Sequence, residues 1–281
     1  MPAMNNMQKG KVYIVGAGCG DPDLITVKGM RLLQQADIVL TDRLASPEII
    51  ERYTIPDTEV VYVGKQCRKG ESTPQATINE LMVLYANEGK TVVRLKGGDV
   101  SMFSNILDEL EVLHKYSIPF EIVPGITAAL GAAAYAGIPL TARNYATAVR
   151  FLTAYRSDVV LEEYWKELAQ TDDTLVFYMS SETLPDVISN LVRHAIDPAR
   201  LLAIIEQATT PFQKIYTGSL YEFEEKWEHR NFLSPSLVII GKVVSLHDKF
   251  DWFNGTRTNG RYFDADHERN RVSQESFGLT A

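Results

Sequence analysis

The sequence Lys11-Val-Tyr-Ile-Val-Gly-Ala-Gly-Cys-Gly-Asp21 places an apolar, β-branched run directly before three closely spaced glycines. The run predicts a buried strand at residues 12–15, and the glycines predict a tight turn into the helix that follows. Glycines at such a turn let the backbone approach a ligand closely and leave amide groups free at the helix start. A plain strand-to-helix turn without a ligand explains this one motif equally well. Other motifs of the chain are needed to distinguish a binding loop from a plain turn.

The first half of the chain repeats this alternation of strand and helix. Further strands are predicted at residues 38–41, 59–63, 91–95 and 120–123, and helices at residues 24–35 and 75–87. Strands joined by helices pair in parallel through right-handed crossovers, and both faces of such a sheet are buried. Because ligands of these sheets bind beyond the carboxyl ends of the strands, we expect a site at that edge.

A composition change at Gly137-Ile-Pro-Leu-Thr141 predicts a boundary between an N-terminal α/β domain (residues 1–138) and a C-terminal α/β domain (residues 139–253). In the second domain, strands are predicted at 149–153, 174–178, 202–206, 214–217 and 237–240, and helices at 162–169, 184–194 and 220–228. The strand at 214–217 follows its predecessor without room for a helix, so this sheet is expected to be mixed. Residues 254–281 are polar and lack periodicity, which predicts a loose tail.

Composition and charge exclude several classes of protein. Hydrophobic residues make up 45% of the 281 residues and the net charge is −8, which argues against a disordered chain and against a broad nucleic-acid-binding face. The two cysteines, Cys19 and Cys67, are too few for a disulfide framework and favour a reducing cytoplasm. The uncharged stretch at 122–142 contains two prolines and three glycines, so we expect a buried strand, turn and helix of a soluble protein there.

Two more predicted strands end in glycines. Arg94-Leu-Lys-Gly-Gly-Asp99 adds a carboxylate to open main-chain groups, which suits a ribose, a sulfonium or an amino-acid ammonium; a turn with an aspartate helix cap is the alternative. Val123-Pro-Gly-Ile-Thr-Ala128 gives a third such end, and three of them at one sheet edge favour a binding site. A nicotinamide-dependent dehydrogenase is disfavoured, because Asp21 stands where the dinucleotide fingerprint needs its third glycine.

These loops belong to a longer series of motifs. The series is Gly16-Ala-Gly-Cys-Gly-Asp-Pro22, Thr41-Asp-Arg-Leu44, Val63-Gly-Lys65, Val93-Arg-Leu-Lys-Gly-Gly-Asp99, Val123-Pro-Gly-Ile-Thr127, Tyr135-Ala-Gly-Ile-Pro-Leu-Thr141 and Leu175-Val-Phe-Tyr-Met179. In this order the motifs resemble the tetrapyrrole methylase family, and within it the uroporphyrinogen-III C-methyltransferases. The similarity extends from residue 11 to residue 253 without large gaps.

The resemblance implies two α/β domains, an N-terminal one with a parallel sheet and a C-terminal one with a mixed sheet, and S-adenosylmethionine bound in the cleft between them. It also implies a homodimer. The implied reaction is two successive methyl transfers to pyrrole carbons of uroporphyrinogen III, which give precorrin-2 for sirohaem or cobalamin synthesis. The expected partner is therefore a small-molecule tetrapyrrole, with no nucleic acid, no membrane and no metal.

Site residues are carried over motif by motif. The cofactor contacts that the resemblance implies are Cys19, Gly97, Gly98, Asp99, Met102, Thr127, Ala128, Met179 and Ala208. The family's acid–base positions fall on Asp42 and Lys65. A carboxylate such as Asp42 can take the proton that a methylated pyrrole must lose, or stabilise the charge that develops there; an ion pair with Arg43 or a helix cap is the alternative role. From its residue type, Lys65 is expected to hold a substrate carboxylate.

The implied substrate is a polycarboxylate, so an acidic protein must present basic groups locally. Arg43, Arg143 and Arg150 are the expected substrate contacts, because arginine can pair with a carboxylate through two hydrogen bonds. For any one of them, a solvated surface charge is the alternative.

Several segments depart from the family pattern, among them Cys19 and Val100 in place of prolines, a missing histidine before Pro74, and Gln207-Ala-Thr209 in place of Asn-Gly-Thr. The usual glycine-arginine-glycine-glycine run is Ser104-Asn-Ile-Leu107, which puts Asn105 in the place of the arginine, and the usual His-Arg-Asp is Ala142-Arg-Asn144. The cofactor side therefore matches the family better than the substrate side. Two alternatives stand beside the main hypothesis: a methylase of another tetrapyrrole, such as a precorrin or cobalt-precorrin, and a non-catalytic protein that binds S-adenosylmethionine.

Overall fold

The computed structural model describes residues 9–66, 71–153, 161–179, 182–227, 229–253, 255 and 260–263, without the side chains of residues 65, 66, 71 and 72. The chain divides into two compact units. The first unit holds the described residues up to Thr127 together with those from Arg261 onward, and the second unit extends from Ala128 to Gly260. The division falls at Thr127 and Ala128, ahead of the position suggested by composition, because the helix that begins at Ala128 packs in the core of the second unit.

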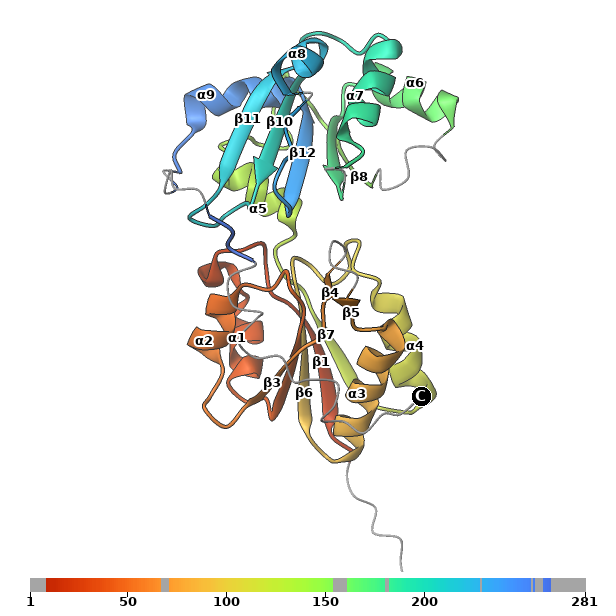
Figure 1. Cartoon of the computed structure of the whole chain (residues 1–281), viewed down its shortest axis with the longest axis vertical. Coiled ribbons are helices and arrows are strands. Elements are labelled where there is room, and N and C mark those ends of the chain that lie inside the picture. The colour runs from red at the N-terminus through yellow and green to blue at the C-terminus, as the bar shows by residue number, and fades with distance from the viewer. Residues whose placement is uncertain are drawn as a thin grey trace, which may run out of the picture. The chain divides into compact units, whose positions relative to one another are not determined.

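The first unit contains a five-stranded sheet with helices on both faces (Figure 1). Its elements are β1 (Lys11–Gly16), η1 (Pro22–Leu24), α1 (Val27–Leu33), β2 (Ile38–Thr41), α2 (Pro47–Tyr53), β3 (Glu59–Tyr62), β4 (Lys65–Gln66), β5 (Glu71–Ser72), α3 (Gln75–Asn87), β6 (Thr91–Lys96), α4 (Ile106–Lys115) and β7 (Phe120–Val123). The strand order is β3-β2-β6-β1-β7, and every neighbouring pair is parallel. The predicted parallel sheet is confirmed.

Alternate residues of these strands pack into two separate apolar layers. Leu40 of β2 packs in one layer with Met82 of α3 and Leu113 of α4. Its neighbour Val39 packs in the other layer with Leu33 of α1. Figure 1 shows α1 and α2 on one face of the sheet and α3 and α4 on the other. Because both faces are covered, the polar groups at the carboxyl ends of the strands are the ones left open to a ligand.

The second unit contains a mixed five-stranded sheet, as predicted. Its elements are α5 (Ala128–Tyr135), β8 (Val149–Thr153), α6 (Glu162–Gln170), β9 (Thr174–Tyr178), α7 (Leu184–Arg193), β10 (Leu201–Glu206), β11 (Lys214–Ser219), η3 (Leu220–Glu222), α8 (Phe223–Trp227), β12 (Ser236–Gly241), η4 (Lys242–Leu246) and α9 (His247–Phe250). The strand order is β11-β10-β12-β9-β8. Only β8 and β9 pair in parallel, because β10 continues into β11 through a short hairpin connection.

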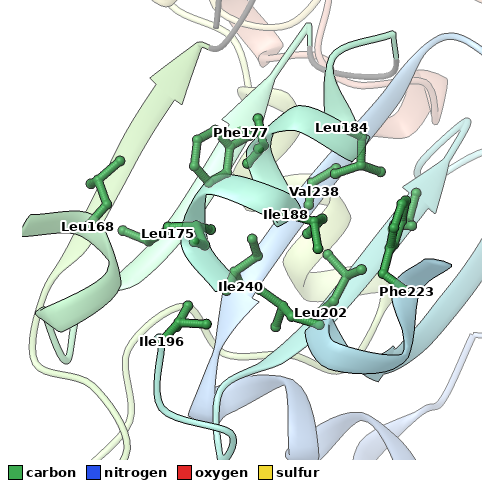
Figure 2. Packing of buried hydrophobic residues seen from close by; sticks show 14 of the residues in the cluster. Leu168, Leu175, Phe177, Leu184, Ile188, Ile196, Leu202, Phe223, Val238 and Ile240 are labelled. Carbon is green, nitrogen blue, oxygen red and sulfur yellow. The ribbon is translucent and has the colours of Figure 1, made fainter. Parts of the chain in front are cut away.

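The two faces of this second sheet are covered by different helices, one with large apolar side chains and one made mostly of alanine. Figure 2 shows Phe177 and Val238 of the sheet packed with Leu184 and Ile188 of α7. On the opposite face, the alanines of α5 pack against the sheet, where Ala129, Ala132 and Ala133 are buried. The small side chains let the helix lie close to the strands, which accounts for the apolar but weakly helical composition of the 122–142 stretch.

The chain beyond β12 departs from the predicted loose tail at two residues. Tyr262 and Phe263 are only 9% and 3% exposed, and they pack on the first unit. Aromatic side chains bury enough apolar surface to hold a polar segment in place. Residues 264–281 lie outside the described residues. Among the described residues, no helix is both long and apolar enough to cross a membrane.

Candidate functional site

The three glycine-bearing strand ends of the first unit are joined to one another. Gly18 and Gly98 exchange two backbone hydrogen bonds, of 3.1 and 2.7 Å, so the loops after β1 and β6 pair. The Gly125 N–H, after β7, donates to Asp99 Oδ2 at 2.9 Å. These loops meet because β6, β1 and β7 are neighbours in the parallel sheet. The predicted grouping of the three loops at one sheet edge is what the structure shows.

The loops approach each other too closely for side chains. A Cβ atom placed on Gly125 would lie 2.3 Å from the Gly98 carbonyl oxygen and 2.8 Å from the backbone of Gly16. Gly98 itself has a φ of 72°, a left-handed conformation that favours glycine. The glycines are therefore required to bring three stretches of main chain together, and a simple strand-to-helix turn would not need all of them.

Cofactor candidates Cys19, Gly97, Asp99 and Met102 lie on or next to these joined loops and are half-buried. Asp99 accepts hydrogen bonds from Ser101 as well as from Gly125. Burial alone would raise the pKa of the Asp99 carboxyl, but these hydrogen bonds outweigh it and hold the pKa below the ordinary 3.8. A fixed, ionised carboxylate at the loop edge can still accept hydrogen bonds from an ammonium or a hydroxyl.

Asp42 follows the last residue of β2 and so lies at the same edge of the sheet as the glycine loops. Main-chain N–H groups hold its carboxylate there. Its Oδ1 accepts from the N–H groups of Leu44 and Ala45, at 2.9 and 3.2 Å. The Gly97 N–H lies 3.3 Å from each carboxylate oxygen, which ties the loop after β2 to the loop after β6. Oδ2 has no other hydrogen-bond donor among the described contacts, and the side chain is 24% exposed. Asp42 thus acts as a loop cap through Oδ1, and among the described contacts Oδ2 accepts only the longer hydrogen bond from Gly97.

A buried group of charges lies behind Asp42, and sequence reasoning did not identify it. Glu109 of α4 is 0% exposed and accepts from Arg94 Nε at 3.0 Å and from Lys96 Nζ at 2.9 Å. Arg94 Nη1 donates to the Leu40 carbonyl, and Nη2 lies 4.0 Å from Asp42 Oδ2. We call Arg94, Lys96 and Glu109 the charged triad. Together with Asp42 it holds two positive and two negative groups, so the charges of these four residues balance.

Within the charged triad, burial disfavours the charged form of Lys96. Burial, with the positive charge of Arg94, lowers the pKa of Lys96 below its ordinary 10.5, and the contact with Glu109 opposes this shift. The signal for the triad was available in the sequence. Arg94 and Lys96 are charged residues in a strand that was predicted to be buried on both faces, and such charges require a counter-charge.

Asn105, one of the residues where the sequence departs from the pattern that the resemblance implies, is the N-cap of the helix that carries Glu109. It is exposed, has a left-handed backbone with a φ of 53°, and its side chain makes no capping hydrogen bond to α4. Its short polar side chain tolerates this conformation. Asn105 therefore shapes the entry to α4 without a charge of its own.

The basic substrate candidates differ in how they are held. Arg43 is half-buried next to Asp42, and Arg143 is exposed in the loop before β8. Arg150 donates to Asp173 and Glu167 at 2.6 Å each, and these hydrogen bonds, first that from Glu167, raise its pKa above its ordinary value. A substrate carboxylate would have to compete with both acidic residues there. The side chain of Lys65 lies outside the described part of the structure.

The remaining cofactor candidates surround the start of α5 and the end of β9. Thr127 is 8% exposed at the end of the first unit, and Ala128 opens the second. Within the second unit, the Ala129 N–H donates to Tyr178 Oη at 3.0 Å, which holds the residue before Met179 against the helix start. Met179 is 52% exposed with a φ of 52°. Ala208 is half-buried against the same apolar layer as Tyr178.

Comparison with known sequences gives a consistent result. A family model described as Tetrapyrrole (Corrin/Porphyrin) Methylases matches residues 11–224. The siroheme synthase of Pseudomonas putida (strain F1) is 46% identical over 252 residues, which cover 90% of this chain and 54% of that protein. The siroheme synthase of Azotobacter vinelandii (strain DJ) is 47% identical over 249 residues, or 89% of this chain and 53% of that protein. The chain thus spans about half the length of these curated relatives.

Solved structures with the same fold include three methyltransferases. A uroporphyrin-III C-methyltransferase from Thermus thermophilus matches with a TM-score of 0.72 and 32% identity, over 87% of this chain and 98% of that one. A structure of uroporphyrin-III C-methyl transferase from the same organism, complexed with S-adenyl homocysteine, matches with a TM-score of 0.69 and 34% identity. The match covers 84% of this chain and 100% of that one. A cobalt precorrin-4 methyltransferase matches with a TM-score of 0.73 and 30% identity, over 83% and 95%.

Proposed function

Because the chain belongs to the tetrapyrrole (corrin/porphyrin) methylase family, we propose that it is an S-adenosylmethionine-dependent methyltransferase that converts uroporphyrinogen III to precorrin-2 by two successive C-methylations. The observation that supports this most is the joined set of glycine loops with Asp42 at their edge. The match to a uroporphyrin-III C-methyltransferase over nearly the whole of that chain supports the choice of substrate.

The first unit has a donor set that fits S-adenosylmethionine. When bound, this cofactor supplies an electrophilic methyl group. It carries ribose hydroxyls and an ammonium, which can donate hydrogen bonds to the Asp99 carboxylate and to the carbonyl oxygen of Gly97, while the N–H groups of Gly97 and Gly98 stay bound to Asp42 and Gly18. The close approach of Gly98 and Gly125 leaves main chain where side chains would otherwise project. In our proposal, Cys19, Met102, Thr127, Ala128, Met179 and Ala208 provide the remaining cofactor contacts.

Replacing Gly125 with alanine is expected to weaken S-adenosylmethionine binding about tenfold or more, because the new Cβ forces the Gly98 and Gly16 loops apart. Isothermal titration calorimetry measures the effect. Gly241→Ala is the matched control, since a Cβ on Gly241 meets no atom closer than 3.3 Å and its backbone is extended. Equal affinities for Gly125→Ala and the unmodified chain would exclude the loops as the cofactor site.

Asp42, Lys65 and the arginines act on the substrate in this proposal. After a pyrrole carbon gains its methyl group, the ring must lose a proton, and Asp42 Oδ2 accepts it while Oδ1 stays held by the Leu44 and Ala45 amides. Lys65, Arg43 and Arg143 pair with substrate carboxylates and so orient the ring. Arg150 retains its contacts with Asp173 and Glu167.

The experiment for substrate identity measures release of S-adenosylhomocysteine with a panel of freshly reduced tetrapyrroles, with and without a chelator. We expect release with uroporphyrinogen III and no loss of rate with the chelator. Release only with a precorrin or cobalt-precorrin would favour the second candidate, which the likeness to a cobalt precorrin-4 methyltransferase supports. Cofactor binding without release on any substrate would indicate a non-catalytic protein. We further propose a cytoplasmic homodimer, which sedimentation of the purified chain tests.

A further inference from the structure

Two of the described residues after the second unit, Tyr262 and Phe263, belong to the first unit and are buried there. Tyr262 and Phe263 pack their rings edge to face, with centroids 5.2 Å apart, and are almost fully covered. They lie beyond residue 224, where the match to the family model ends. Tyr262 and Phe263, which are flanked by polar residues in the sequence, therefore add buried contacts to the part of the fold that the family model covers.

The Tyr262 hydroxyl contacts two different loops. It lies 2.7 Å from Ser46 Oγ, 3.0 Å from Glu48 Oε1 and 3.5 Å from the Gly20 carbonyl oxygen. Burial, aided by Glu48, raises the pKa of Tyr262 to about 12, so the phenol keeps its proton at neutral pH. A phenol has one hydrogen to donate, which Glu48 Oε1 at 3.0 Å and the Gly20 carbonyl oxygen at 3.5 Å share, so the Ser46 hydroxyl donates to Tyr262.

Ser46 is used unusually for the residue before a helix. It is the N-cap of α2, yet its side chain makes no capping hydrogen bond to that helix. An N-cap serine ordinarily bonds a backbone N–H of the first turn, which stabilises the helix. Here the hydroxyl is directed to Tyr262 instead, and both residues are buried. The Ser46 hydroxyl therefore connects the loop after β2 to Tyr262 and makes no hydrogen bond to the first turn of α2.

The two loops held by Tyr262 carry candidate site residues. Gly20 follows Cys19 in the loop after β1. Ser46 follows Ala45, whose N–H holds Asp42 Oδ1 at 3.2 Å. A continuous path of contacts therefore runs from Asp42 through Ala45 and Ser46 to Tyr262, and from there to Gly20.

We propose that Tyr262 is a positioning residue that fixes the loop after β1 and the loop after β2 relative to each other, and so sets the cofactor and substrate contacts of the first unit. This inference rests on the proposed function for the roles of Cys19 and Asp42. The loop contacts themselves are independent of it.

The test compares Tyr262→Phe with Tyr85→Phe in the full chain. Tyr85 is a matched control, because it is also buried in the first unit, donates to a carboxylate, Glu59, at 3.1 Å, and has a pKa raised by burial to about 12. Glu59 begins β3, so this contact lies at the opposite edge of the sheet. Tyr85→Phe loses the hydrogen bond to Glu59, whereas Tyr262→Phe loses the contacts with Ser46 and Glu48, so we expect the urea midpoint to fall in both variants and further in Tyr262→Phe.

Only Tyr262→Phe is expected to raise the S-adenosylmethionine dissociation constant or the tetrapyrrole KM, by about three- to tenfold, and to speed amide hydrogen exchange at Gly20 and Ala45. Identical ligand constants and identical exchange in the two variants would overturn the positioning role. If the unmodified chain binds S-adenosylmethionine but methylates no tetrapyrrole, the proposed function fails. The dissociation constants and exchange rates would still decide for or against Tyr262.

Discussion

Substitution of Asp42 by asparagine is expected to lower kcat about 10²- to 10⁴-fold, the range usual for loss of a general base, with little change in S-adenosylmethionine affinity. Asparagine keeps an oxygen that can accept from the Leu44 and Ala45 amides, so the loop retains its cap. What it loses is the basic Oδ2. The measurement is single-turnover formation of S-adenosylhomocysteine, together with calorimetric titration of the cofactor.

Asp37→Asn is the matched control for this prediction. Asp37 lies just before β2, at the opposite end of the same strand, and its Oδ2 likewise accepts from a backbone amide, that of Thr91, at 2.7 Å. The same loss of one negative charge should leave kcat unchanged there. Full turnover by Asp42→Asn would remove Asp42 from the proton transfer and leave it a loop cap only.

Substitution of Glu109 by alanine is expected to destabilise the first unit by about 3–5 kcal/mol, because it leaves Arg94 and Lys96 buried without their main counter-charge. The pKa of Lys96 should fall further, since Glu109 is the group that opposes the lowering. Asp42 Oδ2, at 4.0 Å from Arg94, would then be drawn toward the triad. We therefore expect lost activity even in the fraction that remains folded. Urea unfolding, followed with activity, measures both effects.

Glu121→Gln provides the comparison for the charged triad. Glu121 also binds two cations of the first unit, Lys11 at 2.6 Å and Lys28, but its side chain is partly exposed. Water screens such pairs, so the loss of stability should be several times smaller than for Glu109→Ala. Equal losses in the two variants would show that burial does not strengthen the dependence on Glu109.

Much of the fold was predictable because strand and helix periods in this chain are regular. The bounds of β2, β7, β8, β9 and α3 agree with the sequence-based prediction. A helix was expected around His114, but the bounds of α4 were not predicted, although Asn105 is a usual N-cap residue type and Asp108 and Glu109 are acidic residues of the first turn. The helix α2 was missed although Ser46 and Pro47 are usual start residues, because the helix is short.

The site was predictable where it depends on glycine and less so where it depends on charge. Glycines 18, 98 and 125 mark positions where backbones touch, and strand order follows from alternation, so their convergence could be predicted. The ion pairs of Arg150 with Glu167 and Asp173 could not be predicted. These residues are distant from Arg150 in the sequence and come near it only because α6 and β9 pack beside β8. Tyr262 and Phe263 are adjacent aromatic residues in a polar segment, and their burial could not be predicted because nothing in the sequence shows which surface they cover.

The most direct test of the account is the number of methyl groups that the chain adds to uroporphyrinogen III. The reduced substrate is generated anaerobically, incubated with excess S-adenosylmethionine and the purified chain, and the product is weighed by mass spectrometry. The account predicts a product with two added methyl groups, formed with Asn105 in the place of the family arginine. Unmethylated substrate after long incubation, with cofactor binding intact by calorimetry, would contradict it.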